Sequence, residues 1–325
     1  MRCIVDKSHN PYWNLAAEEY ILNTFDTPTI RLWQNSDSII VGKNQNTLAQ
    51  INLEYVKNQN IAVVRRVTGG GAVFHDLGNI NFSFFDYKSG KESNIETFHR
   101  FSIPIIEALK SLGADAAIQG RNDIAIDGKK VSGCAMLSKG KRILCHGTLL
   151  YNSNISNLAD ALKHNPEKFR DKSVDSNRSR VTNISEHICK DWNATQFLDY
   201  LHQYLAKDCE IYHFSERDIE EIDKLCKEKY STEEWNFGAS PKYQFINKLH
   251  FKGGTIELYL SINQGIIEDI ELYGDYFFNR DSSEFCNAII GTGHNMKEIA
   301  DKISKEPIGE YFTGITSEEL LKLFF

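Results

Sequence analysis

The chain has 325 residues, of which 41% are hydrophobic and 25% are charged, and its formal net charge is −7. These values predict a folded chain with two domains, or one large domain with an appendage, and argue against long disordered segments. The acidic balance argues against a general nucleic-acid binder, which is usually basic.

Three further features predict a cytoplasmic protein. No stretch approaches the roughly 18 consecutive apolar residues of a membrane span. Near the start of the chain, Arg2, Asp6 and Lys7 interrupt any apolar core of a signal peptide. The seven cysteines are scattered without a C-x-x-C pair, which predicts reduced thiols instead of disulfides or a zinc site.

The first part of the chain predicts short strands mixed with helices. Residues 11–25 predict a helix, because their apolar positions fit one face and Pro11 suits a helix start. A second helix is predicted at 48–60. Apolar and β-branched runs predict strands at 2–6, 29–35, 38–45 and 61–67, and two short strands within 71–87.

The middle of the chain predicts one long helix and three strands. The helix covers 94–114, and we expect it to bend or break near Pro104. The strands cover 115–127, 129–137 and 142–152, with hairpin turns at "DGK" and "SKGK".

The last part of the chain predicts a change of domain. Residues 158–230 are mostly helical in pattern, with a strand at 209–214, and Gly238 and Pro241 then interrupt the pattern. Beyond them, 253–277 alternate like antiparallel strands, and 282–325 predict two or three helices. The prediction is a mixed α/β domain at 1–237 and a small α+β domain at 238–325.

The stretch "RRVTGGGAVFHDLG" (65–78) places three glycines between two arginines and a histidine. Backbone N–H groups without side chains in the way can bind anions, so the run predicts a phosphate site beside Arg66. Neither G-x-G-x-x-G nor G-x-x-x-x-G-K-[ST] is present, which excludes the two common nucleotide motifs. A plain bend between strands is the alternative.

Four motifs occur in order: "RRVTGGGAVFHDLGN", "GRNDIAIDGKKVSGCA", "HGTLL" and "SRVTN". Together they resemble the lipoate–protein ligase family, part of the larger biotin and lipoate ligase fold, over nearly the whole chain. The resemblance implies a catalytic domain at 1–237, with mixed sheets flanked by helices, and a C-terminal accessory domain at 238–325.

The implied activity has two steps. ATP and (R)-lipoate give lipoyl-adenylate and pyrophosphate, with Mg²⁺, and the lipoyl group then passes to a lysine of a carrier domain. The implied carriers are 2-oxoacid dehydrogenase complexes or the glycine cleavage H protein, with no nucleic acid or membrane partner. Lys139, Lys141 and Arg142 could steer a carrier, or they could form only a solvated turn.

The resemblance also implies site residues. Lys130 in "KVSG" is the implied catalytic residue, contacting both the lipoyl carbonyl region and the adenylate phosphate. The residues implied to bind ATP or adenylate are Arg66, Gly70, Gly71, Ala72, Val73, Phe74, Asn79, Asn122 and Lys130. Those expected at the lipoate are Lys130, Trp33, Val67, Gly69, His75 and Ala135.

Several of these assignments have open alternatives. Asn122 and Asp123 are expected on one strand, facing opposite ways, with Asp123 either a Mg²⁺ ligand or part of a local ion pair. Trp33 could be plain core packing, and His75 could be structural. The roles of Arg178 and Arg180 stay open.

Two other functions remain possible on this fold. An ATP-independent transferase would carry the acyl group on a cysteine, for which Cys134 and Cys145 are candidates. The cysteine of such transferases, however, aligns with Ile143, and a cysteine inside a strand is usually a small buried hydrophobe. The other alternative is a lipoate-binding protein without catalysis, against which the joint presence of Arg66, Lys130 and the glycines argues.

Overall fold

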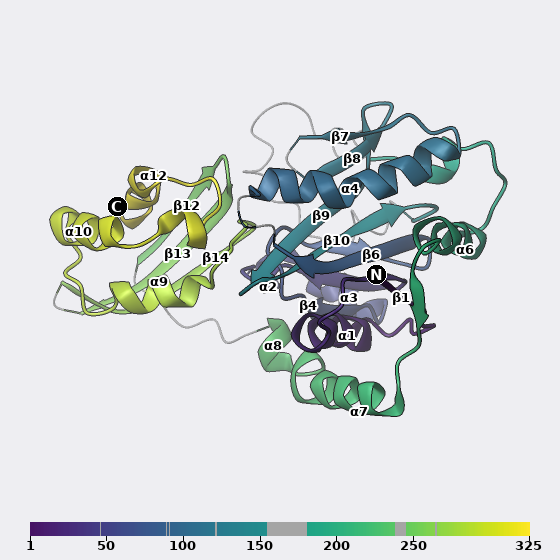
Figure 1. Ribbon diagram of the computed structural model, residues 1–325. Helices are drawn as coiled ribbons and strands as arrows, with labels where there is room; N and C mark the ends of the chain where they lie inside the picture. Colours follow the sequence, from purple (N-terminus) through teal and green to yellow (C-terminus); the bar gives the residue numbers. More distant parts are fainter. Residues whose placement is uncertain are drawn as a thin grey trace.

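The computed structural model describes residues 1–45, 47–88, 90, 92–120, 122–154, 181–237, 245–263 and 265–325. An eight-stranded mixed sheet lies at the centre of the N-terminal part, residues 1–237 (Figure 1). In spatial order its strands are β11 (Glu210–Tyr212), β1 (Arg2–Ile4), β2 (Thr29–Trp33), β6 (Asn79–Tyr87), β10 (Arg142–Leu150), β9 (Lys129–Lys139), β8 (Asp123–Ile126) and β7 (Ala116–Gln119). Strands β11, β1 and β2 pair in parallel, and all other neighbours pair antiparallel.

A second sheet of three strands carries the glycine run. It contains β4 (Ala62–Arg65), β3 (Ser38–Val41) and β5 (Val73–His75), with β3 in the middle. The chain leaves β4 at Arg65, passes through the glycines and returns as β5 antiparallel to β3. Among the described residues of the N-terminal part, the α-helices are α1 (Pro11–Thr24), α2 (Thr47–Gln50), α3 (Leu53–Asn58), α4 (Asn94–Ser111), α6 (Ala194–Leu205), α7 (Glu216–Leu225) and α8 (Glu233–Phe237), and a π-helical turn, η5 (Cys226–Tyr230), follows α7.

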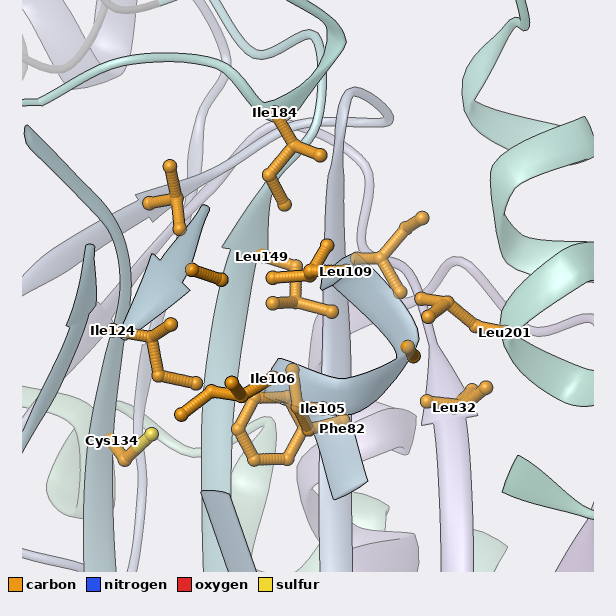
Figure 2. Packing of buried hydrophobic residues seen from close by; sticks show 14 of the residues in the cluster. Leu32, Phe82, Ile105, Ile106, Leu109, Ile124, Cys134, Leu149, Ile184 and Leu201 are labelled. Atoms are coloured by element: carbon orange, nitrogen blue, oxygen red, sulfur yellow. The ribbon is translucent and has the colours of Figure 1, made fainter. Parts of the chain in front are cut away.

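One face of the large sheet packs against α4 and α6 to form the main apolar core (Figure 2). Strand β6 contributes Ile80, Phe82 and Phe84, which are two residues apart because successive strand side chains point to opposite faces. From α4, side chains such as Ile105 and Leu109 cover them, and both are fully buried. This core fixes the strands that carry the site on their other face.

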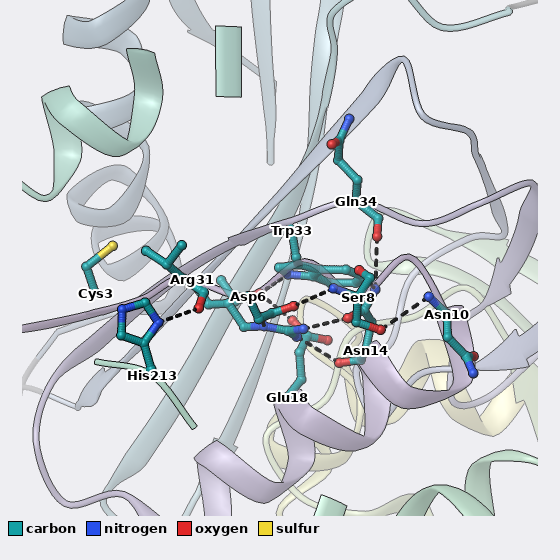
Figure 3. A network of polar contacts seen from close by, with 12 residues as sticks. Cys3, Asp6, Ser8, Asn10, Asn14, Glu18, Arg31, Trp33, Gln34 and His213 are labelled. Carbon is teal, nitrogen blue, oxygen red and sulfur yellow. Dashed lines mark hydrogen bonds and ion pairs between the residues drawn. The ribbon is translucent and has the colours of Figure 1, made fainter. Parts of the chain in front are cut away.

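The opposite face of the same strands is buried but polar. Strand β6 turns Asn81 and Ser83 to this side, and both are almost fully buried. Ser83 is paired with His146 on β10 and with Arg31 on β2. Helix α1 covers this face, and its Asn14 accepts hydrogen bonds from the fully buried Arg31, in the network shown in Figure 3.

The C-terminal part, residues 245–263 and 265–325, has its own sheet and core (Figure 1). Strands β12 (Phe245–Phe251), β13 (Gly254–Asn263) and β14 (Ile266–Gly274) pair antiparallel in that order. Helices α9 (Ser282–Ile289), α10 (Met296–Lys305), α11 (Ile308–Tyr311) and α12 (Ser317–Leu321) follow. The two parts touch through an ion pair of 3.0 Å between Lys43 and Asp281, and through a backbone hydrogen bond from Gly274 to Asn44.

The structure differs from the predicted elements at several places, one of which is β12, a strand that lies outside every predicted element. Helix α4 runs unbroken through Pro104, because core side chains before and after the proline hold it against the sheet. The predicted strand 115–127 is a hairpin of β7 and β8, and the helix predicted at 48–60 is two short helices. The C-terminal part has four α-helices in the described residues, where two or three were predicted.

Some predictions fall outside the described residues. These are the first part of the helical pattern, from Leu158 to residue 180, which includes Arg178 and Arg180, and the proposed domain boundary at Gly238 with Pro241. Within the described ranges, no helix is both long enough and apolar enough to cross a membrane.

Candidate active site

A cavity of about 300 Å³ lies between the glycine run and the polar face of the large sheet. It is bounded by β5 and the glycine run on one side and by β6, β8, β9 and β10 on the other. Asp275 and Phe277 of the C-terminal part complete its wall. It therefore brings together three of the motifs found in the sequence.

The backbone has a different reason to carry a glycine at each position of the run. A Cβ on Gly69 would collide with the carbonyl oxygen of Tyr276 in the C-terminal part. Gly70 has a φ of 91°, a left-handed conformation that side chains other than glycine rarely adopt. A Cβ on Gly71 would meet no atom within 4 Å, so this glycine leaves open space on the cavity wall.

Two arginines hold the glycine run and the loop beside it through main-chain carbonyls. Arg66 donates from Nη2 to the carbonyl oxygens of Gly69 (2.6 Å) and Gly71 (2.8 Å). Arg65 donates to the carbonyls of the neighbouring loop, including that of Gln45 at 2.7 Å. Burial lowers the pKa of Arg66 to about 10, which still leaves the guanidinium charged at neutral pH. Arg66 thus places a positive charge directly beneath the glycines.

A chain of buried hydrogen bonds connects Arg66 to helix α1. Arg66 Nε donates to the Thr68 hydroxyl at 2.9 Å, and that hydroxyl lies 2.8 Å from His146 Nε2. His146 Nδ1 lies 2.9 Å from Glu18 on α1. With the His146 proton on Nδ1, every group has a partner: the Thr68 hydroxyl donates to Nε2 and Nδ1–H donates to Glu18. The Ser83 hydroxyl also donates to Glu18, at 2.5 Å.

Two buried hydrogen-bond donors on the cavity wall lack a partner within the described chain. The Asn35 amide, oriented by Asn14, donates to His75 Nδ1 at 3.1 Å, so the His75 proton lies on Nε2, which has no partner. Likewise Asn79 donates to the Asn81 oxygen at 3.0 Å, which leaves Asn81 Nδ2 unpaired. Because an unmade buried hydrogen bond is costly, two donors facing one cavity indicate a ligand with acceptor oxygens.

Lys130 lies opposite the glycine run because of a β-bulge. The register of β8 and β9 shifts so that Ser132 opposes Ile124 while Lys130 opposes Ala125. Regular alternation would put Lys130 and Gly133 on opposite faces, whereas here both line the cavity. A Cβ on Gly133 would lie 2.9 Å from Lys130 Nζ, so the glycine makes room for the ammonium group.

Lys130 is paired with Asp123 and supported by the fourth motif. Its Nζ lies 2.8 Å from Asp123 Oδ1, with the two side chains 38% and 31% exposed. An ion pair this exposed contributes only about 0–1 kcal/mol, so an anionic ligand can compete for the ammonium. The carbonyl of Lys130 accepts from Thr182 N–H at 3.0 Å, which explains why "SRVTN" accompanies the lysine motif.

The cavity gathers most of the residues singled out from the sequence. Those that line it are Trp33, Arg66, Gly70, Gly71, Ala72, Val73, His75, Asn122, Asp123, Lys130 and Ala135. Asn122 and Asp123 were expected to face opposite ways on one strand. Asn122 instead lies in the turn before β8, Asp123 is the first residue of β8, and both line the cavity.

Four expected site residues do not line the cavity. Phe74 lies between Val73 and His75 on β5, so its side chain points to the other face and packs near Ile39. Val67 packs against two apolar clusters, one with Trp33 and one with Leu144, and lines a separate hollow. Gly69 lies under Tyr276. Asn79 is fully buried and acts on the cavity only through Asn81.

The sequence reasoning missed Glu18, Thr68, His146 and Asn81. His146 stood within "HGTLL" and Thr68 within "RRVTGGG", so the motifs contained a signal that was not assigned to these residues. Glu18 had no such signal, because only the packing of α1 brings it to His146, 128 residues away in the chain.

The two candidate cysteines are poor nucleophiles. Cys134 and Cys145 are both buried, and burial raises the pKa of Cys134 to about 12 and that of Cys145 well above its ordinary value. The nucleophilic form of cysteine is the thiolate, which such pKa values suppress at neutral pH. None of the chain's seven cysteines forms a disulfide.

Comparisons with known proteins match both parts of the chain. Residues 10–206 match the family "Lipoyl protein ligase A/B catalytic domain", and residues 240–324 match "Bacterial lipoate protein ligase C-terminus". The lipoate–protein ligase LplJ of Bacillus subtilis is 39% identical over 324 residues, covering 98% of this chain and 97% of the relative.

Two solved structures share the fold. LipL1 of P. falciparum, in complex with lipoate, is 26% identical, has a TM-score of 0.78, and the match covers 94% of each chain. A lipoate–protein ligase A bound with ATP is 28% identical with a TM-score of 0.64, covering 73% of this chain and 98% of that one.

The hydrogen-bond chain under the glycine run gives a stability prediction. Thr68→Val keeps the side-chain shape but removes the hydroxyl, which leaves Arg66 Nε and His146 Nε2 buried without this partner. We expect the free energy of unfolding to fall by about 1–3 kcal/mol. The exposed Thr24→Val should change it by less than about 0.5 kcal/mol. Urea denaturation measures both, and equal stabilities would show that water replaces the hydroxyl.

His75 gives a pH prediction. Burial, with Arg66 and His146 nearby, lowers the pKa of His75 from 6.5 to about 3. Below about pH 6.5, His75 therefore binds a proton in the unfolded chain but stays neutral in the folded chain. The free energy of unfolding consequently falls as the pH falls below about 6.5. Relative to His75→Gln, the wild type should lose about 2 kcal/mol of unfolding free energy between pH 7 and pH 5. Urea denaturation of both proteins at pH 7 and pH 5 measures this difference. If the wild type and His75→Gln lose the same free energy of unfolding, His75 is protonated in the folded chain.

Proposed function

The chain belongs to the lipoyl protein ligase A/B family, and we propose that it activates lipoate with ATP and transfers the lipoyl group to a lysine of a carrier domain. The observation that supports this most is the cavity, where Lys130 faces the open backbone at Gly71. His75 Nε2 and Asn81 Nδ2 add two unpaired buried donors to its wall. This is a set of groups for binding oxygen anions.

The first step brings two anions together. A lipoate carboxylate oxygen attacks the α-phosphorus of ATP, and the bond to pyrophosphate breaks, so pyrophosphate leaves with the electron pair. Lys130 reduces the repulsion between carboxylate and phosphate, and the charge of Arg66 beneath the glycines acts in the same direction. Gly71, with no side chain, lets a phosphate approach the backbone. Direct contacts of Asn122 and the 70–73 backbone with the nucleotide are part of the proposal.

The second step needs the same lysine. The amine of the carrier attacks the lipoyl carbonyl carbon, the bond to the adenylate oxygen breaks, and AMP leaves while the amine loses a proton to water. Lys130 stabilises the negative charge that develops on the leaving phosphate. We propose that Trp33 and Ala135, which line the cavity beside it, contact the lipoyl chain.

The alternatives have less support. A thioester route needs a thiolate, and burial raises the pKa of both Cys134 and Cys145. A binding protein without catalysis would not need Lys130 to line the same cavity as the open backbone of the glycine run.

The proposal also covers the metal ion and the cellular location. We propose that Asp123, a carboxylate on the cavity wall, helps to hold Mg²⁺ together with the nucleotide phosphates and water, which supply most Mg²⁺ ligands in such sites. Bound there, the ion would neutralise phosphate charge. Within the described residues, no group of three or more acidic, histidine or cysteine side chains forms a metal site. We further propose a cytoplasmic enzyme that serves 2-oxoacid dehydrogenase or glycine cleavage carriers.

The sharpest test compares two neighbouring lysines. Lys130 lines the cavity, whereas Lys129 is exposed at the hairpin. Lys130→Ala should lower lipoate-dependent pyrophosphate release, measured without any carrier, by about 100- to 1,000-fold. Lys129→Ala should stay near wild type. Circular dichroism checks that both variants fold. Equal rates for the two variants would mean that Lys130 is not the lysine that acts at the phosphate.

The glycine run gives a second test. Gly71→Val adds a side chain into open space, so it should leave the unfolding free energy within about 0.5 kcal/mol of wild type. It should nevertheless weaken ATP binding by at least about tenfold, because the added atoms occupy the place of a phosphate. Gly70→Val is less informative, because φ at Gly70 is 91° and the change strains the loop itself. Titration calorimetry that finds wild-type ATP affinity in Gly71→Val would support the plain-bend interpretation.

A further inference from the structure

Asn81 lies within a row of four residues that crosses the large sheet along the wall of the candidate active site. On β6 it is paired with Trp33 of β2 on one side and with Thr148 of β10 on the other. The row ends at Gly133 on β9, whose N–H donates to the Thr148 hydroxyl at 3.4 Å. Strands β6, β10 and β9 lie side by side in Figure 1. All four residues of the row line the cavity.

The two ends of the row differ in chemistry. Trp33 is the wall proposed for the lipoyl chain, and it is almost fully buried. At the other end Gly133 makes room for Lys130, because a Cβ there would lie 2.9 Å from Nζ. Strand spacing puts the Asn81 backbone about 5 Å from that of Trp33 and about 10 Å from that of Gly133. Asn81 therefore lies where the apolar chain of a bound acid ends and its carboxyl group begins.

The Asn81 amide is buried, oriented and incomplete. Asn81 is 2% exposed, and its oxygen accepts a hydrogen bond of 3.0 Å from Nδ2 of the fully buried Asn79. Its own Nδ2 has no partner within the described residues. Reversing both amides would keep their hydrogen bond but present an oxygen, which can only accept, to a cavity lined by Lys130 and Arg66. Because these cations make the cavity a site for anions, the N–H is the group that fits.

We propose that Asn81 is a further catalytic residue, whose Nδ2–H donates to the carboxyl oxygen of the bound acid that does not attack ATP. This inference rests on the proposed function. An unmade buried hydrogen bond is costly, so an oxygen that completes the Asn81 amide binds favourably there. Lys130, at the end of the row, then meets the phosphate, while Asn81 meets the acyl oxygen.

The same contact serves both steps. In the first, one carboxylate oxygen bonds to the α-phosphorus and pyrophosphate leaves with the electron pair, while the oxygen held by Asn81 becomes the carbonyl oxygen of the adenylate. In the second, attack of the carrier amine moves the carbonyl electron pair onto this oxygen. The pair returns as the bond to AMP breaks, and the amine proton goes to water. A fixed donor at an oxygen that gains charge in the transition state lowers the barrier.

Two variants separate a chemical role of Asn81 from a structural one. Asn81→Ala and Asn79→Ala both break the hydrogen bond between the two amides, but only Asn81→Ala removes the donor from the cavity. Urea denaturation compares the free energy of unfolding of the two full-length variants. Calorimetry measures their affinity for ATP alone and for lipoate alone. Two rates are then measured: lipoate-dependent pyrophosphate release, and transfer from preformed lipoyl-adenylate to an apo lipoyl domain.

We expect Asn81→Ala to weaken lipoate binding by about tenfold or more, with ATP affinity unchanged. Pyrophosphate release and transfer should each fall by about 100-fold. Asn79→Ala should lose clearly less in both rates, because the donor is still present. If Asn81→Ala does not fold, Asn81→Ser takes its place, since its hydroxyl can still accept from Asn79 but is shorter than the amide. The same pattern is expected.

Octanoate tests which part of the substrate Asn81 contacts. Octanoate and lipoate share the carboxylate and differ at the far end of the chain. Asn81→Ala should therefore lower pyrophosphate release by the same factor with either acid. A loss confined to lipoate would place Asn81 at the distal ring and overturn the proposal.

Three other results would also overturn it. Wild-type rates in Asn81→Ala would mean that water completes the amide, and equal losses in Asn81→Ala and Asn79→Ala would give both residues a structural role. Weakened ATP binding with wild-type lipoate affinity would place the donor at a phosphate. The proposed function fails on a separate result, a wild type that releases no pyrophosphate with lipoate.

Discussion

The site depends on a charged guanidinium that is buried under a loop of glycines. A buried guanidinium needs acceptors for its N–H groups, and Arg66 finds them in the carbonyls of Gly69, Gly71 and Ile40. The carbonyls of Gly69 and Gly71 reach Arg66 because the loop between β4 and β5 turns its backbone toward the guanidinium, and that of Ile40 comes from β3. The same turn leaves Gly71 open to the cavity. Positive charge and an open backbone at one place thus have a single structural origin.

The support for this arrangement comes from a face of the sheet that is buried and polar at once. Alternation along β6 sends Phe82 and Phe84 into the core under α4, and Asn81 and Ser83 toward α1. On that side Glu18 connects through His146 to the glycine loop. A partly satisfied network of this kind would be costly, so its two unpaired donors are best explained by a ligand.

The C-terminal part forms part of the wall of the candidate active site. The Tyr276 carbonyl occupies the space above Gly69, and Phe277 lines the cavity. The shape of the cavity therefore depends on how the C-terminal part is placed against the glycine run. The ion pair between Lys43 and Asp281 is partly exposed, and such pairs contribute little to stability, so the closer packing of Tyr276 against Gly69 contributes to the contact as well.

The sequence by itself determined the motifs, the strand and helix content of most of the chain, and the identity of Arg66, Lys130 and the glycines as a group. These features follow from the pattern of residue types within short stretches of the sequence. It could not determine which side chains face the cavity. A β-bulge after Lys130, a turn at Asn122 and the alternation at Phe74 set those directions, and each depends on strand register. The contact of Glu18 with His146 and the place of Phe277 in the cavity wall join segments far apart in the chain, so only the tertiary structure decided them.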